Sequence, residues 1–99
     1  MDLAEVTSKM QAALGAGGFD KKVKFDFGDI GKILVDGPGG KVSNDDGAAD
    51  ATVSVAFDDF VKLAQGALDP MMAYMSGKIK VAGDMSVAMK LQSLLSKLR

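Results

Sequence analysis

The clearest structural signal in the sequence is Gly-Lys-Ile-Lys-Val-Ala-Gly-Asp, residues 77–84. Inside it, apolar residues alternate with lysines, which is typical of a β-strand with one buried face and one solvated face. Gly83 is expected to break this strand, and Asp84 is a residue type that caps helices. The sequence therefore predicts a strand that leads directly into a helix over residues 85–98.

Four further segments have the same two-residue period, and each has the length of a short strand: residues 22–27, 32–36, 41–43 and 52–57. Pro38-Gly39 fits the two central positions of a type II turn between the second and third of these segments. Strands with one apolar and one polar face build a sheet that is covered on one side only. We therefore expect an α+β fold, with a mainly antiparallel, twisted sheet of about five strands and helices covering one face.

Three segments before the last helix have helical signals. Apolar residues recur every three or four positions over residues 3–14. Asp58-Asp59 is expected to cap a helix that continues through residue 65. Asp69-Pro70 combines an N-cap residue with a proline at the first helical position, and it predicts a brief helix over residues 71–76.

The composition excludes most classes of chemistry. The 99 residues are 47% apolar, which suffices for a single domain over residues 1–99 with its own core. Cys and His are both absent, so thiol and imidazole catalysis, redox pairs and the usual zinc sites are excluded. A net charge of −1 argues against a nucleic-acid partner. No stretch approaches the roughly 18 apolar residues of a membrane span, and no secretory signal is apparent, so we expect a cytoplasmic protein.

Three local patterns look like functional motifs but have simpler explanations. Gly31-Lys32 lacks the first glycine and the Ser or Thr of a phosphate-binding loop. The polar cluster at residues 44–47 has valines where a calcium loop needs its first and last ligands. Ser86 and Lys90 share a helix face, but a catalytic lysine needs desolvation and this face is expected to be solvated. We therefore expect a binding protein with no catalytic residues, no metal site and no cofactor.

The predicted last helix is apolar over far more of its circumference than packing on a core requires. Its apolar residues span roughly 220°, whereas a stripe of about 100° is enough for a core-facing helix. Gln92 lies inside the apolar arc, and the brief helix over residues 71–76 is also apolar on all sides. These two methionine-rich helices flank one strand, which favours a shared, adaptable apolar cavity. A larger core and a protein partner remain the alternatives.

Residues 69–85, Asp-Pro-Met-Met-Ala-Tyr-Met-Ser-Gly-Lys-Ile-Lys-Val-Ala-Gly-Asp-Met, followed by Ala-Met-Lys-Leu at 88–91, resemble the sterol carrier protein 2 family. Asp50-Ala51-Thr52 and residues 60–66 also match its pattern, and the resemblance covers about residues 22–95. The family fold is a helix, three strands, a crossover to a fourth strand, helices, a fifth strand and a final helix. This order agrees with the order of elements predicted above.

The resemblance implies non-catalytic binding and transfer of a fatty acid, a fatty acyl-CoA or a sterol-like lipid in an apolar tunnel between sheet and helices, with an acyl chain favoured. We also expect a monomer that contacts membranes transiently. By position the resemblance assigns eight residues to the tunnel: Phe60, Leu63, Met72, Met75, Met85, Ala88, Met89 and Gln92. The alternative function is a protein–protein interaction or homodimerisation module that buries the same apolar surface.

Overall fold

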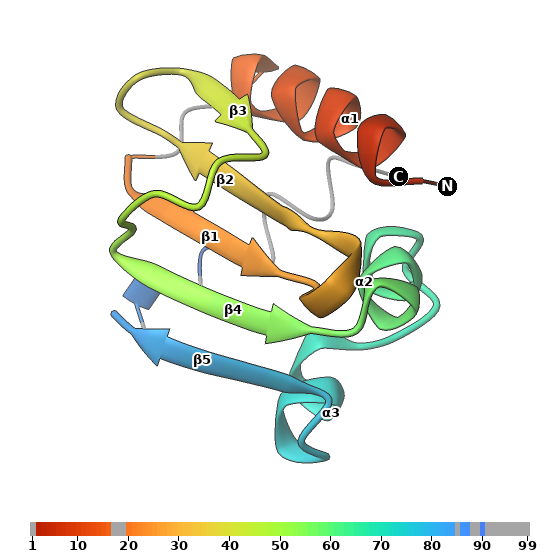
Figure 1. The fold of residues 1–99 in the computed structure, drawn as a ribbon. Coiled ribbons are helices and arrows are strands. Elements are labelled where there is room, and N and C mark those ends of the chain that lie inside the picture. The colour runs from red at the N-terminus through yellow and green to blue at the C-terminus, as the bar shows by residue number, and fades with distance from the viewer. Residues whose placement is uncertain (1, 17–19, 85, 88–89, 91–99) are drawn as a thin grey trace.

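One five-stranded sheet organises the part of the chain that the computed structural model describes, which comprises residues 2–16, 20–84, 86–87 and 90 (Figure 1). The helix α1 precedes the sheet, η1 is a single 3-10 turn, and α2 and α3 lie between the fourth and fifth strands. The bounds are α1 Leu3–Ala16, β1 Lys22–Asp26, η1 Gly28–Ile30, β2 Lys32–Asp36, β3 Lys41–Ser43, β4 Ala51–Val55, α2 Phe57–Ala64, α3 Pro70–Met75 and β5 Ile79–Gly83.

The sheet has the strand order β3-β2-β1-β4-β5, and every neighbouring pair is antiparallel except β1 with β4. The prediction of a mainly antiparallel five-stranded sheet is therefore confirmed. The parallel pair requires a crossover from β3 to β4, which passes in front of β2 and β1 in Figure 1. Lys24 on β1 holds this crossover against the sheet, with its Nζ 2.7 Å from Oδ1 of Asp46.

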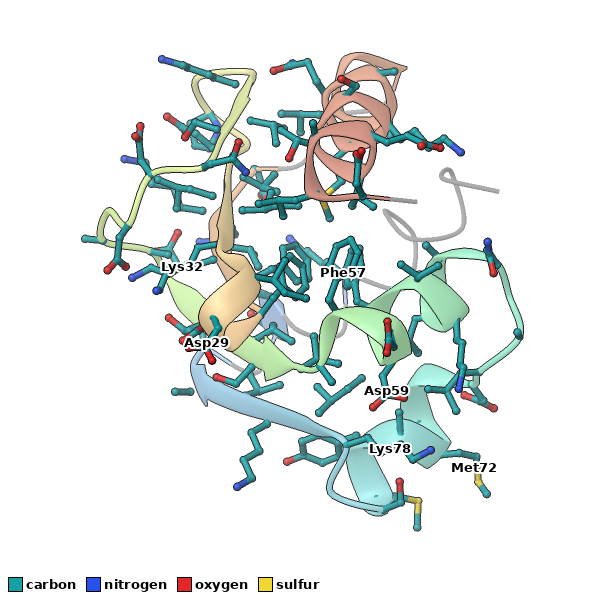
Figure 2. All side chains as sticks on the ribbon, turned by 45° about the vertical axis from the view of Figure 1, so that its right-hand side comes forward. Asp29, Lys32, Phe57, Asp59, Met72 and Lys78 are labelled. Atoms are coloured by element: carbon teal, nitrogen blue, oxygen red, sulfur yellow. The ribbon has the colours of Figure 1, made fainter. Side chains whose placement is uncertain are left out.

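The helices cover one face of the sheet, as the strand pattern predicted, and the crossover lies on the other face (Figure 2). On the covered face, alternate strand residues are buried, among them Val23, Phe25, Ile33, Val35 and Val53. The helices complete the core with buried side chains of α1, α2 and α3: Val6, Met10, Ala13, Leu14, Phe57, Phe60, Leu63, Ala64 and Ala73. The intervening strand residues are exposed or half-buried, so the opposite face stays largely polar.

The start of α2 differs from the prediction. The helix begins at Phe57 with Ala56 at the N-cap and no capping side chain, so Asp58 and Asp59 lie in its first turn. The expectation that these two acids cap the helix is wrong. Phe57 leaves the strand because its ring packs edge-on against Phe27, with 5.2 Å between the ring centroids. Within the first turn, the acids still complement the positive end of the helix dipole.

The turn between β2 and β3 also differs. The amide of Gly40 donates to the carbonyl of Gly37 (3.1 Å), and the left-handed residue is Gly40, with a φ of +65°. A type II turn would instead require a positive φ at Gly39, so that prediction is wrong. The Gly39 amide donates to Oδ1 of Asp36 (2.9 Å), a side-chain contact that holds the turn in its observed form.

At the end of β5, the backbone lies close to the residues that start β4. Gly83 pairs with Ala51 at a φ of +104°, and a Cβ on Gly83 would lie 2.5 Å from the carbonyl oxygen of Asp50. Only glycine fits there, which explains its place in the 77–84 stretch. The next residue, Asp84, donates its amide to the same carbonyl at 3.0 Å.

We predict that Gly83→Ala lowers the free energy of unfolding by about 3 kcal/mol or more, because backbone strain adds to a clash with fixed backbone atoms. Gly77→Ala is the matched control, since Gly77 also has a positive φ (+83°) but no atom within 4 Å of an added Cβ. It should cost about 1 kcal/mol. Urea unfolding followed by circular dichroism measures both, and equal losses would refute the steric explanation.

Candidate functional site

The short helix α3 is fixed at both ends by local contacts. Oδ1 of Asp69 accepts a hydrogen bond from the Met71 amide (2.9 Å), and Pro70 occupies the first helical position, as the sequence predicted. At the other end, Gly77 takes a φ of +83° and the Lys78 amide donates to the carbonyl of Ala73 (2.9 Å). These contacts hold six residues in a helix that is too short to be stable by itself.

Most of α3 is apolar and lies at the surface. Among the α3 residues whose burial the structure describes, Ala73 alone is buried, and it is fully buried in the core. The other large side chains expose a large share of their area: Met71 63%, Met72 63%, Tyr74 45% and Met75 77%. Figure 2 shows Met72 and Lys78 together at this corner of the molecule. Large apolar side chains grouped on a surface mark a contact site for a ligand, a partner or a membrane.

Four phenylalanine rings pack beneath α2 at one end of the core. Phe60 is fully buried, and its ring centroid lies 5.1 Å from that of Phe25 and 5.0 Å from that of Phe27, both edge-on. Leu63, one turn further along α2, is 2% exposed. This cluster forms the apolar interior between α2 and the sheet, and it lies on the side of the sheet from which α3 also projects (Figure 2).

The eight residues that the resemblance assigned to the tunnel fall into three groups. Phe60 and Leu63 are buried under α2, whereas Met72 and Met75 are exposed on α3. The structure therefore does not bring these two pairs onto one surface. The other four, which follow β5, lie outside the described residues: Met85, Ala88, Met89 and Gln92.

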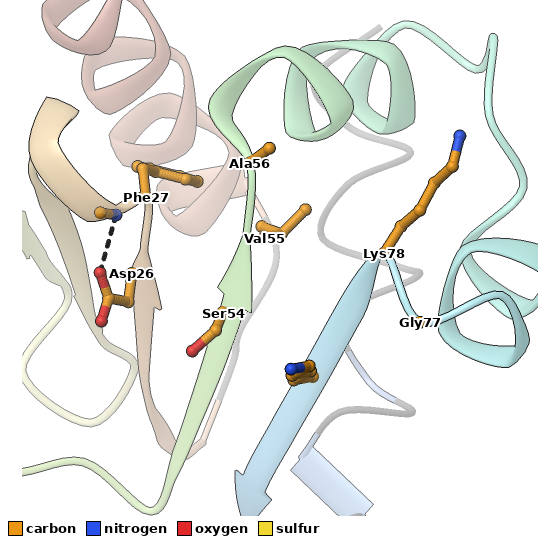
Figure 3. Close-up of a pocket in the computed structure, with 9 residues that line it drawn as sticks. Asp26, Phe27, Ser54, Val55, Ala56, Gly77 and Lys78 are labelled. Atoms are coloured by element: carbon orange, nitrogen blue, oxygen red, sulfur yellow. Dashed lines mark hydrogen bonds between the residues drawn. The ribbon is translucent and has the colours of Figure 1, made fainter.

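A surface hollow of about 320 Å³ opens where β1 and β4 end and β5 begins (Figure 3). Its apolar walls come from Phe27, Val55 and Ala56, and its polar groups come from Asp26, Ser54, Lys78 and Lys80. The sequence analysis missed this hollow, since it treated the two lysines only as the solvated face of a strand. The sequence does show that these lysines alternate with Ile79 and Val81. It does not show that three strands have their ends at this place, because that arrangement arises only when the chain folds.

Two contacts anchor the chain that follows β5. Oδ1 of Asp84 accepts from the hydroxyl (2.7 Å) and the amide (2.9 Å) of Ser86, so the predicted cap is confirmed, and Ser86, Val87 and Lys90 are helical. These hydrogen bonds lower the pKa of the Asp84 carboxyl. Farther along, Nζ of Lys90 lies 3.1 Å from Oδ1 of Asp20, and this contact lowers the pKa of Asp20.

Neither a metal-binding cluster nor a membrane-spanning helix occurs within the described residues. No three or more acidic side chains within them are grouped so that they could hold a metal ion. Within the same residues, no helix has both the length and the apolar character needed to cross a membrane.

Comparison with known proteins identifies the family. The sequence model of the SCP-2 sterol transfer family matches residues 5–96. The chain belongs to the SCP-2 sterol transfer family. This is a lipid-binding and lipid-transfer family, and its domain is generally non-catalytic. The resemblance found in the sequence is therefore confirmed.

Two curated relatives of this SCP-2 domain are much longer than the chain. Hydroxysteroid dehydrogenase-like protein 2 of Mus musculus is 45% identical over 62 residues, which is 61% of this chain and 13% of the relative. Human sterol carrier protein 2 is 39% identical over 74 residues, which is 60% of this chain and 14% of the relative. The chain thus spans about an eighth of the length of these proteins, and their names describe far more than the matched segment.

Solved SCP-2 structures share the fold. Sterol carrier protein 2 of Aedes aegypti, solved as a complex with the C16 fatty acid palmitate, has a TM-score of 0.84 at 23% identity, with 100% of both chains covered. Sterol carrier protein 2 like 2 of Aedes aegypti has a TM-score of 0.79 at 23% identity, with 91% of this chain and 93% of that chain covered. The predicted SCP-2-like α+β architecture is therefore confirmed.

We predict that acid weakens the fold partly through Asp84. Because its pKa is lowered by folding, the carboxylate contributes stability above its ordinary pKa of 3.8, and this contribution is lost as the pH falls through the lower folded value. Asp84→Asn keeps a capping side chain but removes the titration. Urea midpoints at pH 7 and pH 3 should therefore differ less in Asp84→Asn than in the wild type.

Asp45→Asn is the control for this measurement, since Asp45 is an exposed acid in the crossover between β3 and β4. It should keep the pH dependence of the wild type. If Asp84→Asn also keeps it, the hydrogen bonds from Ser86 do not stabilise the carboxylate.

Proposed function

We propose that this chain is a non-catalytic carrier of single acyl chains, taking a fatty acid or fatty acyl-CoA into an apolar tunnel between the sheet and the helices. The observation that carries the proposal is the SCP-2 family match over residues 5–96, because it spans the sheet and all three described helices. The mosquito protein with the same fold was solved with palmitate, which supports an acyl chain as the ligand. A sterol-like lipid is the less favoured ligand.

The energetics of an acyl chain suit this proposal. Each methylene moved out of water contributes roughly 0.8 kcal/mol, so about a dozen methylenes give roughly 10 kcal/mol before ordering costs. Those costs reduce the net affinity to the micromolar range, at about 8 kcal/mol. A carrier needs such an intermediate affinity, because it must release its lipid as well as bind it.

We propose the tunnel lining that the family layout assigns by position. Phe60 and Leu63 would form its inner wall under α2, and the flexible thioethers of Met72 and Met75 would meet the lipid at its mouth. The amide of Gln92 would hydrogen-bond the carboxylate head group. The rest of the lining comes from the segment after β5: Met85, Ala88 and Met89.

We further propose that the carrier works as a monomer in the cytoplasm and touches membranes transiently. One observation favours a different function, a protein-interaction or homodimerisation module: four large apolar side chains of α3 are exposed. Such a module would bury them in a protein interface rather than use them around a lipid.

Binding should tolerate several acyl chain lengths, because methionine side chains repack around different shapes at low cost. We expect fatty acids of neighbouring lengths to displace a fluorescent fatty acid with affinities within about tenfold of one another. A single optimum with its neighbours rejected about a hundredfold would contradict an adaptable carrier.

Native mass spectrometry of the protein purified from cells separates the two functions. A monomer that carries one acyl lipid is expected from the proposal. A dimer without lipid would overturn it in favour of the interaction module, since the exposed side chains would then be buried between copies.

The seven methionines provide reporters for the tunnel. In protein labelled with ¹³C at the methionine methyl groups, we predict that palmitate shifts the resonances of Met72, Met75, Met85 and Met89. Met10, which is fully buried against the sheet, and Met71, which is 63% exposed on α3, serve as internal controls and should not shift. If Met10 moves and the four predicted residues do not, the lipid lies elsewhere in the core.

A further inference from the structure

We infer that α3 and the two lysines after it form a docking surface for an anionic lipid bilayer, an inference that rests on the proposed carrier function and deepens it. This docking surface consists of Met71, Met72, Tyr74 and Met75 on α3 together with Lys78 and Lys80. Its occupant is the headgroup and upper acyl region of the membrane that donates or receives the lipid.

The direction of the α3 side chains suits a flat surface. Met71 and Met75 are one helical turn apart, and at 100° per residue both point about 160° away from Ala73, the one α3 residue named in the buried core. They are 63% and 77% exposed, so the helix presents its apolar ridge outward. In Figure 1, α3 lies at the end of the molecule farthest from α1 and β3, where no other described element extends beyond it.

The charges beside this ridge complement an anionic membrane. Lys78 and Lys80 are both exposed and line the hollow next to α3. In the described part of the chain the ion pairs are Lys9–Glu5, Lys24–Asp46 and Lys90–Asp20, none of which uses either lysine. The acids nearest to these lysines along the chain, Asp69 and Asp84, accept the hydrogen bonds that start α3 and the helical residues after β5. Asp26, which lines the same hollow, accepts a hydrogen bond from the Gly28 amide. Two exposed cations beside an apolar ridge match the composition of interfacial segments that bind anionic lipid.

The size of the ridge argues against a protein partner. A stable protein complex uses about 20–30 residues on each side and buries about 800 Å² per partner, whereas this ridge has four large side chains on a six-residue helix. A bilayer requires no matching shape, and a few side chains inserted to a depth of about 5–10 Å are enough for reversible attachment. Tyr74 also suits the interface, since its ring is apolar and its hydroxyl can stay in water.

Vesicle flotation tests the inference with the whole chain, using phosphatidylcholine vesicles with and without phosphatidylserine. Met71→Gln replaces an apolar tip with a polar one of similar length, and it should weaken binding to the anionic vesicles about tenfold. Met71→Leu keeps the apolar area and the helix propensity, so it should bind as the wild type does. Met71 is outside the assigned tunnel lining, so Met71→Gln should keep the wild-type affinity for fatty acid in solution.

A second pair of variants tests the charges. Lys78→Gln should lower binding to anionic vesicles about fivefold at low salt and flatten the salt dependence. Lys41→Gln is matched in charge but lies on β3, at the opposite edge of the sheet, and should change binding by less than about twofold. Circular dichroism confirms that each variant is folded.

Three results would overturn the docking surface. These are an absence of wild-type binding to anionic vesicles, equal losses for Lys78→Gln and Lys41→Gln, and a concentration-dependent dimer that Met71→Gln dissociates. Fatty-acid displacement without vesicles separates this inference from the proposed function. If fatty acid binds but vesicles do not, only the docking surface fails. If vesicles bind through Met71 and Lys78 but fatty acid does not, the carrier function fails.

Discussion

The fold depends on the way Asp50 joins three segments that are far apart in the sequence. Its backbone amide donates to the carbonyl of Lys22 (2.9 Å), and its Oδ2 accepts from the amide of the same residue (2.9 Å). Its own carbonyl accepts from the amide of Asp84 (3.0 Å). One residue therefore fixes the start of β1, the start of β4 and the end of β5. The crossover before β4 must deliver the chain to this point, because the parallel pairing of β1 with β4 begins here.

This junction also determines where the functional elements lie. Gly83 can approach the Asp50 carbonyl only without a side chain, and the close approach brings Asp84 to the position from which it caps the following helix. At the other end of β5, Gly77 and Lys78 complete the hydrogen bonds of α3. The 77–84 stretch thus has, near each end, a glycine with a positive φ: Gly77 ends α3 and Gly83 ends β5. The stretch connects α3 at one end to the helical residues Ser86 and Val87 at the other.

The strands could be predicted from the sequence because burial on one face imposes a two-residue period directly on the residue types. The bounds of β2 and β3 agree with the prediction residue for residue. Where a tertiary contact competes with local signals, the prediction failed: Phe57 continues the strand pattern of β4, yet it turns into α2 to pack on Phe27. The order of the strands in the sheet could not be predicted either. The Asp50 junction that brings β1, β4 and β5 together uses mostly backbone groups, which every residue type carries.

The candidate site was predictable in composition but not in exposure. The sequence showed that α3 is apolar on all sides, and a helix of that kind is ordinarily buried. Here the helix is six residues long and is fixed at both ends by Asp69 and Gly77, so it turns Ala73 toward the core while its four large apolar side chains stay exposed. Lys78, directly before β5, and Lys80, within it, are exposed because of the strand that they belong to or adjoin. Ile79 and Val81 pack against the core, so the two-residue period forces Lys78 and Lys80 outward beside the methionines. The alternation over residues 78–81 thus places two apolar side chains against the core and two lysines at the surface beside α3.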